Sequence, residues 1–373
     1  MLSVCMIVRD EEENLPRCLE SVKGVADEII VVDTGSKDRT KEIALEYGAK
    51  VYDHPWEDNF SLHRNQALGY ATKKFVLIID ADEEFFLTDE PEKFKKFLKK
   101  LPDSYSTMSI LAKDVQGGRE VMQFNSARIF RRGMVQYQDR VHNQPKTDGK
   151  GGIYEHCFIK HYGYDLTPEK KEAKKQRILK MLGLRLKDNP KDWDAYFYLC
   201  QCHAVNGEID ESIAAGETYI EHTGENIKDS VFFTMLRQYM KKGNEQKASE
   251  WLNMGIERRE DDLDLNAAMV EFGVWTKNSS LIIRGATQYV LSHEKMKKNQ
   301  ATGGNRFVFS FNNEVLAFCF QWLAKVKIEE GKIALEKLKE LLPSTADECR
   351  EKTSTDMVEF GKRLGVISYE FAS

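Results

Sequence analysis

Two aspartates separated by one residue, Asp80-Ala81-Asp82, follow an apolar run at residues 75–79. Such a run is typical of a buried strand, within which alternate side chains would point to opposite faces of a sheet. At the strand's exit the backbone can turn, so both carboxylates can reach one ligand. Hard carboxylate oxygens suit Mg²⁺ or Mn²⁺, which in turn neutralises a diphosphate. This DXD pattern is therefore a candidate metal and diphosphate site.

Polar turns also follow two earlier apolar runs, at residues 2–8 and 28–32. In an open α/β sheet, ligands bind beyond the carboxyl ends of the strands. Asp33 or Ser36 alone could be only a helix cap. The position of three acidic or polar turns at strand ends favours a binding site. The two earlier turns read Arg9-Asp10-Glu11-Glu12 and Asp33-Thr34-Gly35-Ser36-Lys37-Asp38.

The elements that must position these turns alternate between strands and helices. Strands separated by helices of this length indicate βαβ units and a mostly parallel, Rossmann-like sheet. We therefore expect an α/β domain over residues 1–165. The expected strands are residues 2–8, 28–32, 50–52 and 75–79, and the expected helices are 12–23, 37–47 and 60–72.

Residues 166–373 have a different character, because no proline occurs between Lys191 and Leu342. Proline is the strongest helix breaker, so this interval predicts an all-α array. Helical hairpins with turn glycines at Gly207 and Gly243 resemble tetratricopeptide repeats, whose period is 34 residues. Weaker copies would turn near Asn278 and Gly331, and generic helical hairpins are the alternative. Such an array commonly binds a peptide or another subunit, so a polypeptide partner or a homodimer is expected.

Composition limits the class of protein. The chain has 373 residues, a net charge of −5 and 41% hydrophobic residues, which excludes wholesale disorder and argues against a nucleic-acid-binding protein. No apolar run is long enough for a transmembrane segment, and residues 2–8 are too short for a secretory signal. Seven scattered cysteines indicate reduced thiols and a cytoplasmic protein.

Three segments in this order and spacing resemble glycosyltransferase family 2: residues 2–12, residues 28–40 and Asp80-Ala81-Asp82. The resemblance covers roughly residues 1–165. It implies a GT-A fold and an inverting transfer of a sugar from a nucleotide diphosphate, usually UDP. It also implies a divalent cofactor, Mn²⁺ or Mg²⁺. The chain departs from the family at Asp10, where asparagine is usual.

The same resemblance implies roles for individual residues. Val8, at the end of the first strand, and Asp33 would hold the nucleotide base, Asp80 would contact the ribose and Asp82 would ligate the metal. Arg64 matches a basic position near the nucleotide.

Two later residues match family patterns less closely. Arg128 matches a position near the diphosphate or acceptor, although it could belong to a surface basic cluster. His161, in His161-Tyr162-Gly163-Tyr164, would ligate the metal from the far side of the site. Its alternative is a capping or core histidine.

The catalytic base does not carry over from the family. An inverting transfer needs a carboxylate or imidazole to take the acceptor's proton. Relatives have a His-Glu pair where this chain has His142-Asn143, and asparagine cannot act as a base. Asp139, His142 and Glu155 are the candidates, with Asp139 preferred. A thiol acceptor would need less help, and an inactive or hydrolysing enzyme is also open.

Two other classes compete with the glycosyltransferase. A nucleotidyltransferase would carry a glycine-rich, basic loop after its first strand, whereas residues 9–13 contain no glycine. A non-catalytic scaffold, in which the helical repeats bind a protein partner, is supported by Asn143. The acceptor, a polypeptide or a glycan, and the sugar depend on loops expected around residues 111–125 and 133–155.

Overall fold

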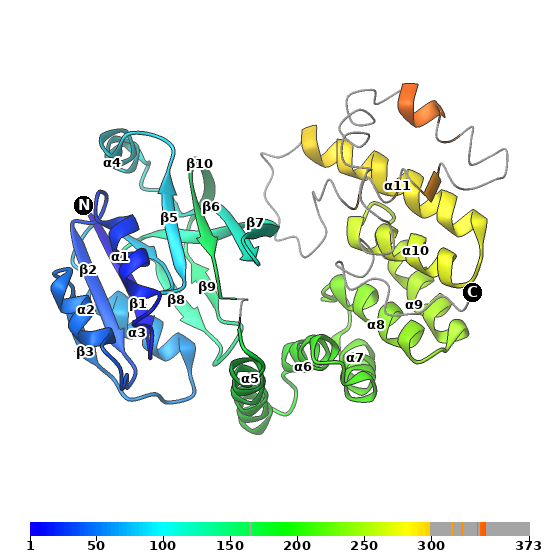
Figure 1. Ribbon diagram of the computed structural model, residues 1–373, viewed down its shortest axis with the longest axis horizontal. Coiled ribbons are helices and arrows are strands. Elements are labelled where there is room, and N and C mark those ends of the chain that lie inside the picture. The colour runs from blue at the N-terminus through cyan, green and yellow to red at the C-terminus, as the bar shows by residue number, and fades with distance from the viewer. Residues whose placement is uncertain are drawn as a thin grey trace. The chain divides into compact units, whose positions relative to one another are not determined.

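The structure is a computed structural model that describes residues 1–163 and 166–298, with positions 315, 319, 322, 323, 334 and 336–340. Contacts within the chain define two compact units, one spanning Met1–Ala195 and one beginning at Tyr196 (Figure 1). The first unit thus includes the helix α5 (Pro168–Asp188). The domain boundary after residue 165 stays a prediction from the sequence.

A mixed sheet forms the frame of the first unit. Among the described residues it has eight strands, in the order β3-β2-β1-β4-β7-β6-β10-β5. The first four strands in this order are parallel to one another, so their carboxyl ends meet at one edge. This half confirms the predicted βαβ arrangement. Its strands are β1 (Leu2–Val8), β2 (Glu28–Asp33), β3 (Lys50–Asp53) and β4 (Phe75–Ile78).

The other half of the sheet is where the sequence analysis expects loops. It is mostly antiparallel: β7 is antiparallel to β4 and β6, and β10 is parallel to β6 but antiparallel to β5. The expectation of loops around residues 111–125 and 133–155 is wrong for most of these positions, which lie in strands. The strands are β5 (Glu83–Leu87), β6 (Tyr105–Gln116), β7 (Arg119–Arg131) and β10 (Lys150–His161), with β8 (Val135–Gln138) and β9 (Gln144–Thr147) forming a separate two-stranded ribbon.

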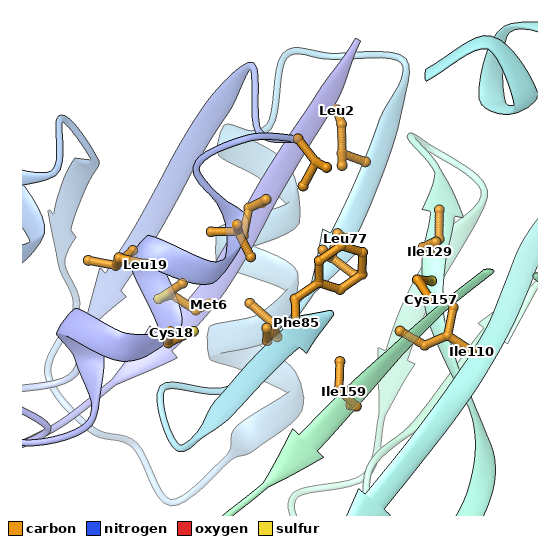
Figure 2. Packing of buried hydrophobic residues seen from close by; sticks show 14 of the residues in the cluster. Leu2, Met6, Cys18, Leu19, Leu77, Phe85, Ile110, Ile129, Cys157 and Ile159 are labelled. Atoms are coloured by element: carbon orange, nitrogen blue, oxygen red, sulfur yellow. The ribbon is translucent and has the colours of Figure 1, made fainter. Parts of the chain in front are cut away.

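Both faces of β1, β2 and β4 are buried, which explains their continuous apolar runs, whereas the edge strand β3 is partly exposed. On β1, Met6 packs in one hydrophobic cluster and its neighbour Cys5 in another. The first cluster includes Cys18 and Leu19 of α1 and extends to Phe85 of β5 (Figure 2). The second includes Ala67 of the helix α3. The helices α1 and α3 thus cover opposite faces of the sheet. Because the strands are parallel, the turns that lead from each strand into the next helix lie together at the carboxyl edge.

Local sequence explains where the helices of the first unit begin. Proline occupies the first turn of α1, α4 and α5, where its missing N–H group has no intrahelical partner to lose. The side chains of Asn59 and Thr167 accept hydrogen bonds from backbone N–H groups at the starts of α3 and α5. The helices are α1 (Leu15–Val22), α2 (Thr40–Glu46), α3 (Phe60–Tyr70), α4 (Pro91–Lys100) and α5.

The second unit is helical over the residues that the structure describes, as the absence of proline predicts. Gly207 and Gly243 lie in turns between paired helices with φ of 76° and 74°, a region that favours glycine. A third turn precedes Ser279, close to the predicted turn at Asn278, whereas Gly331 lies outside the described residues. The pairs are α6 (Trp193–Val205) with α7 (Ile209–Thr223), α8 (Ser230–Lys241) with α9 (Glu245–Arg258), and α10 (Leu263–Trp275) with α11 (Ser279–Lys298).

Two further expectations concern cysteines and membranes. The cysteines that the structure describes, namely Cys5, Cys18, Cys157, Cys200, Cys202 and Cys319, are all free thiols. Within the described part of the chain, no helix combines the length and the apolar character needed to cross a bilayer. The cytoplasmic location stays a prediction.

Candidate functional site

Val8 and Asp33 lie side by side where β1 and β2 end, because the parallel register pairs them. The buried Val8 accepts hydrogen bonds at its carbonyl from the N–H and hydroxyl groups of Thr34. The N–H groups of Gly35 and Ser36 both donate to Oδ1 of Asp33 at 2.9 Å. Gly35 has a φ of 106°, which a larger residue would rarely adopt. The turn therefore holds the Asp33 carboxylate in a fixed place.

An open pocket of about 470 Å³ lies beside Asp33. Oδ2 of Asp33 is buried and has no hydrogen-bond partner among the described residues. A buried acceptor without a partner is costly, so this oxygen is suited to a ligand that donates a hydrogen bond. The pocket is lined by the turn after β2, the segment after β3 and one residue of α5, in residues Arg9, Asp33, Thr34, Gly35, Asp53, His54, Pro55, Trp56, Asp58 and Lys180.

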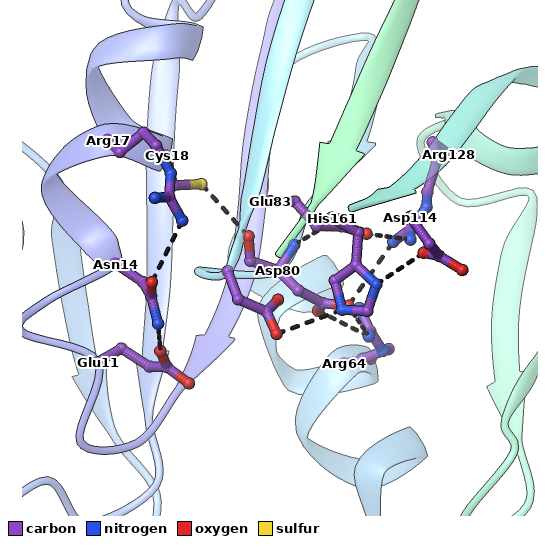
Figure 3. Close-up of polar contacts among 11 residues, drawn as sticks. Glu11, Asn14, Arg17, Cys18, Arg64, Asp80, Glu83, Asp114, Arg128 and His161 are labelled. Carbon is purple, nitrogen blue, oxygen red and sulfur yellow. Dashed lines mark hydrogen bonds and ion pairs between the residues drawn. The ribbon is translucent and has the colours of Figure 1, made fainter. Parts of the chain in front are cut away.

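Asp80, just beyond the end of β4, contacts two arginines (Figure 3). Nη2 of Arg64, on α3, donates to both Asp80 carboxylate oxygens at 2.8 and 3.0 Å. Nη1 of Arg128, on β7, lies 3.8 Å from Oδ2 of Asp80. Burial by itself would raise the pKa of Asp80, but the two guanidinium groups hold it below its ordinary value. Arg64 and Asp80, which the sequence analysis assigns to the site separately, thus contact each other directly.

Glu83 is a further acid of this cluster that the sequence analysis does not assign. Its carboxylate accepts a hydrogen bond from Nη2 of Arg128 at 2.5 Å and one from the backbone N–H of Asp80 at 2.9 Å. Burial raises the pKa of Glu83 to about 7, although Arg128 opposes the shift. Glu83 therefore fixes both the backbone of the DXD segment and the guanidinium of Arg128.

Asp82 and His161 approach one another from two strand ends. Nε2 of His161, at the end of β10, lies 3.3 Å from Oδ2 of Asp82, which precedes β5. Nδ1 of His161 lies 2.9 Å from Oδ1 of Asp114 on β6. Burial would lower the pKa of His161, but the hydrogen bonds to Asp114 and Asp82 outweigh it and raise that pKa to about 10. The two predicted metal ligands are therefore adjacent.

Gly163 leaves space between these two side chains. A Cβ atom at this position would lie 2.1 Å from Oδ2 of Asp82 and 2.6 Å from Nε2 of His161. The carboxylate oxygen and the imidazole nitrogen thus converge on a place that only glycine leaves free. No group of three His, Cys, Asp or Glu residues gathers at metal-binding distance within the described residues. A carboxylate oxygen and an imidazole nitrogen side by side nevertheless fit Mn²⁺ or Mg²⁺, which commonly complete their shells with substrate phosphates and water.

Glu11 is a second acid near this cluster to which the sequence analysis gives no role. Its backbone N–H donates to Oγ1 of Thr40 at 2.8 Å, and its carboxylate accepts a hydrogen bond from Asn14 at 2.9 Å. Burial raises the pKa of Glu11 to about 7, and the negative charges of Asp82 and Asp80 contribute. The clue in the sequence is its position directly after β1, at the edge where Asp80 follows β4.

Two of the three candidate bases, Asp139 and His142, lie on the loop between β8 and β9, whereas the third, Glu155, is an exposed residue of β10. The φ angles of Asp139 and His142 are 71° and 54°, uncommon values for residues other than glycine. The loop is held from two sides: Ser61 donates to the Asp139 carbonyl at 2.6 Å, and Arg185 donates to the Val141 carbonyl at 3.1 Å. Arg185 also lies 3.5 Å from the Asp139 carboxylate.

The predicted residues thus fall into four groups within the first unit. Arg64, Asp80 and Arg128 form one bonded cluster with Glu83, and Asp82 pairs with His161. Val8 and Asp33 mark the neighbouring strand ends, and Asp139 and His142 share the β8–β9 loop. The roles of all nine residues stay predictions.

Residues 3–153 match the model of the family described as Glycosyl transferase family 2. This segment includes β1 to β9, the DXD turn and the paired Arg64 and Asp80. The parallel half of the sheet, with acidic turns at its carboxyl edge, has the arrangement expected of a GT-A domain. The chain therefore carries a glycosyltransferase family 2 domain, as the sequence motifs predict.

Curated relatives resemble about half of the chain. A TPR repeat-containing protein of Synechococcus elongatus is 37% identical over 212 residues, which cover 53% of this chain and 50% of the relative. The SPbeta prophage-derived glycosyltransferase SunS of Bacillus subtilis is 27% identical over 207 residues, covering 52% and 47%. The chain thus spans about half the length of these relatives.

Similar solved structures include TarS of S. aureus, residues 1–349, in complex with UDP-GlcNAc. It covers 69% of this chain and 92% of its own, with 16% identity and a TM-score of 0.39. Glucosyl-3-phosphoglycerate synthase of Mycobacterium tuberculosis in complex with Mn²⁺ and UDP covers 32% and 45%, with 23% identity and a TM-score of 0.24.

Proposed function

We propose that this protein is an inverting glycosyltransferase that moves a sugar from a UDP-sugar to a polypeptide or glycan acceptor, with Mn²⁺ or Mg²⁺ as cofactor. One observation carries the proposal: at the DXD turn of the family 2 domain, two largely buried arginines contact Asp80, and His161 contacts Asp82. Fixed positive charge beside two metal-type donors suits a leaving diphosphate.

The donor's base would bind in the pocket beside Asp33. The unpartnered Oδ2 of Asp33 can accept one hydrogen bond, and the N3–H group of uracil is a donor of the required kind. The aromatic ring of Trp56 also lines the pocket and offers a surface for a planar base. These two features support a UDP-linked donor.

Arg64 and Arg128 would act on the diphosphate as permanent cations. Both guanidinium groups are largely buried, with 11% and 14% of their side-chain surface exposed. Nε and Nη1 of Arg64 have no hydrogen-bond partner among the described residues. A small movement of the side chain would direct these donors to a phosphate oxygen, where charge develops as the bond to the sugar breaks.

Asp82 and His161 would hold the divalent cation. When bound, such a cation supplies positive charge that neutralises the departing diphosphate. The chain's own contribution is to present one carboxylate oxygen and one imidazole nitrogen, 3.3 Å apart, beside the space left by Gly163. Asp80, engaged by Arg64, is not a direct ligand in this proposal.

The acceptor would attack the anomeric carbon from the face opposite the diphosphate. As the new bond to the acceptor's oxygen or sulfur forms, the bond from carbon to the phosphate oxygen breaks and UDP leaves. A base takes the acceptor's proton. Asp139 is the proposed base and His142 its alternative, since both are on a loop held by α3 and α5.

A non-catalytic scaffold is the second candidate, because Asn143 stands where relatives carry an acid. In that case the helices of the second unit would bind a protein partner or a second copy of the chain. A scaffold should neither hydrolyse nucleotide sugars nor bind UDP more tightly with Mn²⁺. Size-exclusion chromatography with light scattering would test for the dimer.

The proposed function is tested by screening nucleotide sugars for hydrolysis by mass spectrometry and by titrating UDP with and without Mn²⁺. We expect one UDP-sugar to be hydrolysed and Asp82→Asn to lower the rate about 100-fold or more, as expected for loss of several kcal/mol of metal stabilisation. The matched control is Asp148→Asn, an exposed aspartate in the β9–β10 turn. Full activity of Asp82→Asn would refute the metal assignment.

A further inference from the structure

Asp114 is a buried carboxylate behind His161 that the sequence motifs do not include. Its side chain is 2% exposed, and Oδ1 lies 2.9 Å from Nδ1 of His161 (Figure 3). Oδ2 is buried without a hydrogen-bond partner among the described residues. Burying a carboxylate with one oxygen unpaired costs stability. The fold therefore retains Asp114 at a cost, which favours a role beyond packing.

The sheet itself sets the position of this carboxylate. Strands β6 and β10 are parallel neighbours, and their register pairs Asp114 with His161. On β6 the buried residues alternate with partly buried ones, and Met108, Ile110 and Ala112 precede Asp114 on the buried face. A carboxylate at this register position faces the imidazole of the neighbouring strand. Both groups are on strands rather than on mobile loops, so their relative orientation is well defined.

The hydrogen bond to Asp114 determines which imidazole nitrogen faces the site. Nδ1 donates to Asp114, so Nε2 is the nitrogen that points to Asp82, at 3.3 Å. On the far side, a Cβ at residue 163 would lie 2.6 Å from this nitrogen, and glycine leaves that space free. Metal-bound histidines typically donate their other ring N–H group to a carboxylate in this way.

We propose that Asp114 is a positioning residue: it fixes the ring and the tautomer of His161 so that Nε2 and the Asp82 carboxylate face one divalent cation together. The proposal rests on the metal-dependent function proposed above. Asp114 itself would touch neither the cation nor the substrate. Its effect on the reaction would come entirely through the orientation of His161.

The test is Mn²⁺ binding to the full chain saturated with UDP, measured from the electron paramagnetic resonance signal of free Mn²⁺. Asp114→Asn keeps the shape of the side chain but removes the carboxylate. We expect its Mn²⁺ affinity to fall about 10- to 100-fold, as for other partners of metal-bound histidines. UDP affinity without metal should be unchanged. Asp148→Asn is the matched control and should bind Mn²⁺ like the wild type.

A second measurement covers the case in which Asp114→Asn does not fold. In the wild-type protein with ¹⁵N-labelled histidine, the Nε2 resonance of His161 should shift when Mg²⁺ is added to the UDP complex, while Nδ1 keeps its proton. A protonated Nε2 with a bare Nδ1 in that complex would overturn the proposal. The proposal would also be overturned if Asp114→Asn bound Mn²⁺ within twofold of the wild-type affinity while Asp82→Asn no longer bound Mn²⁺. If the wild type itself binds no Mn²⁺, the metal-dependent function fails and this role fails with it.

Discussion

Arg64 donates from a single nitrogen, Nη2, to both carboxylate oxygens of Asp80, at 2.8 and 3.0 Å. The Asp80 carboxylate therefore already contacts the largely buried guanidinium of Arg64 before any ligand binds. Asp82, two residues later, contacts His161 instead. The two aspartates of the DXD turn thus have different surroundings, one paired with guanidinium groups and the other beside an imidazole. This difference suggests different tasks for them.

Replacing Arg64 by methionine should destabilise the first unit. The substitution removes two charge-assisted hydrogen bonds to Asp80, whose carboxylate then keeps only the more distant Arg128. Loss of such bonds costs about 1–3 kcal/mol. Urea unfolding at pH 7 would measure it, with Arg39→Met, an exposed arginine 3.6 Å from Glu46, as the control. Equal urea unfolding midpoints for the two variants would show that the Arg64–Asp80 pair contributes nothing to stability.

Glu28 should make the stability of the first unit depend on pH in the acidic range. Its buried carboxylate accepts hydrogen bonds from Ser3 at 2.6 Å, from the Thr72 backbone at 2.8 Å and from Lys50 at 2.8 Å. Burial would raise the pKa of Glu28, but the bonds from Lys50 and Ser3 and those from Thr72 lower it to about 2. The folded state therefore binds this proton less readily than the unfolded chain, whose glutamate titrates near 4.3.

The direction in which stability changes with pH follows from that difference in pKa. The contribution of Glu28 is fully present above about pH 4.3 and is lost as pH falls toward 2. Glu28→Gln should therefore be less stable than the wild type at pH 7, by about 1–3 kcal/mol, and the gap should close toward pH 2. Urea unfolding at several pH values measures the gap. Glu20→Gln, on the exposed side of α1, should show no such gap, and a constant deficit in Glu28→Gln would contradict the linkage.

Strands β1, β2 and β4 of the parallel half are predictable because they are buried on both faces and read as unbroken apolar runs. The antiparallel half is not, because its buried positions include polar residues. On β6, Ser106 and Asp114 occupy buried positions of the alternating pattern. Polar residues therefore interrupt the alternating apolar pattern near both ends of β6. No sequence motif distinguishes such a strand from a polar loop.

The residue pattern by itself predicts the site only where residues follow a strand end, whereas Arg64 and Arg128 are identified through the family resemblance. Asp33, Asp80 and Asp82 follow apolar runs directly, so their placement at one edge follows from the parallel topology. Asp114 and Glu83 escape prediction because their roles depend on partners in distant strands. Only the period-two register of β6 offers a clue to Asp114, by placing an acid on a buried face.

Arg185, on α5, should affect catalysis through the loop of the candidate bases. It donates to the Val141 carbonyl at 3.1 Å and also pairs with Asp192 at 2.8 Å. Without it, the loop of Asp139 and His142 keeps the hydrogen bonds from Phe60 and Ser61 of α3 but loses the one that Arg185 donates to its backbone. Since misplacement by about 1 Å can cost about 100-fold in rate, Arg185→Met should lower kcat strongly while UDP affinity stays close to that of the wild type.

Lys187→Met is the matched control for Arg185→Met, since Lys187 is an exposed cation of the same helix. Steady-state kinetics with the hydrolysed UDP-sugar give kcat, and calorimetry gives the UDP dissociation constant. Equal kcat in the two variants would remove Arg185 from the mechanism. A parallel loss of UDP binding in Arg185→Met would instead indicate general damage to the first unit.

Gly163→Ala should separate the two candidate metal ligands while the fold survives. The added methyl group would meet Oδ2 of Asp82 and Nε2 of His161, both at the ends of side chains that can rotate away. We therefore expect little change in the melting temperature but loss of Mn²⁺-dependent UDP binding, measured by calorimetry. Gly69→Ala is the control, because a Cβ there on α3 meets nothing within 4 Å and alanine favours a helix. Since the two substitutions add the same atoms, Mn²⁺-dependent binding that survives equally in both would mean that Asp82 and His161 do not hold the cation together.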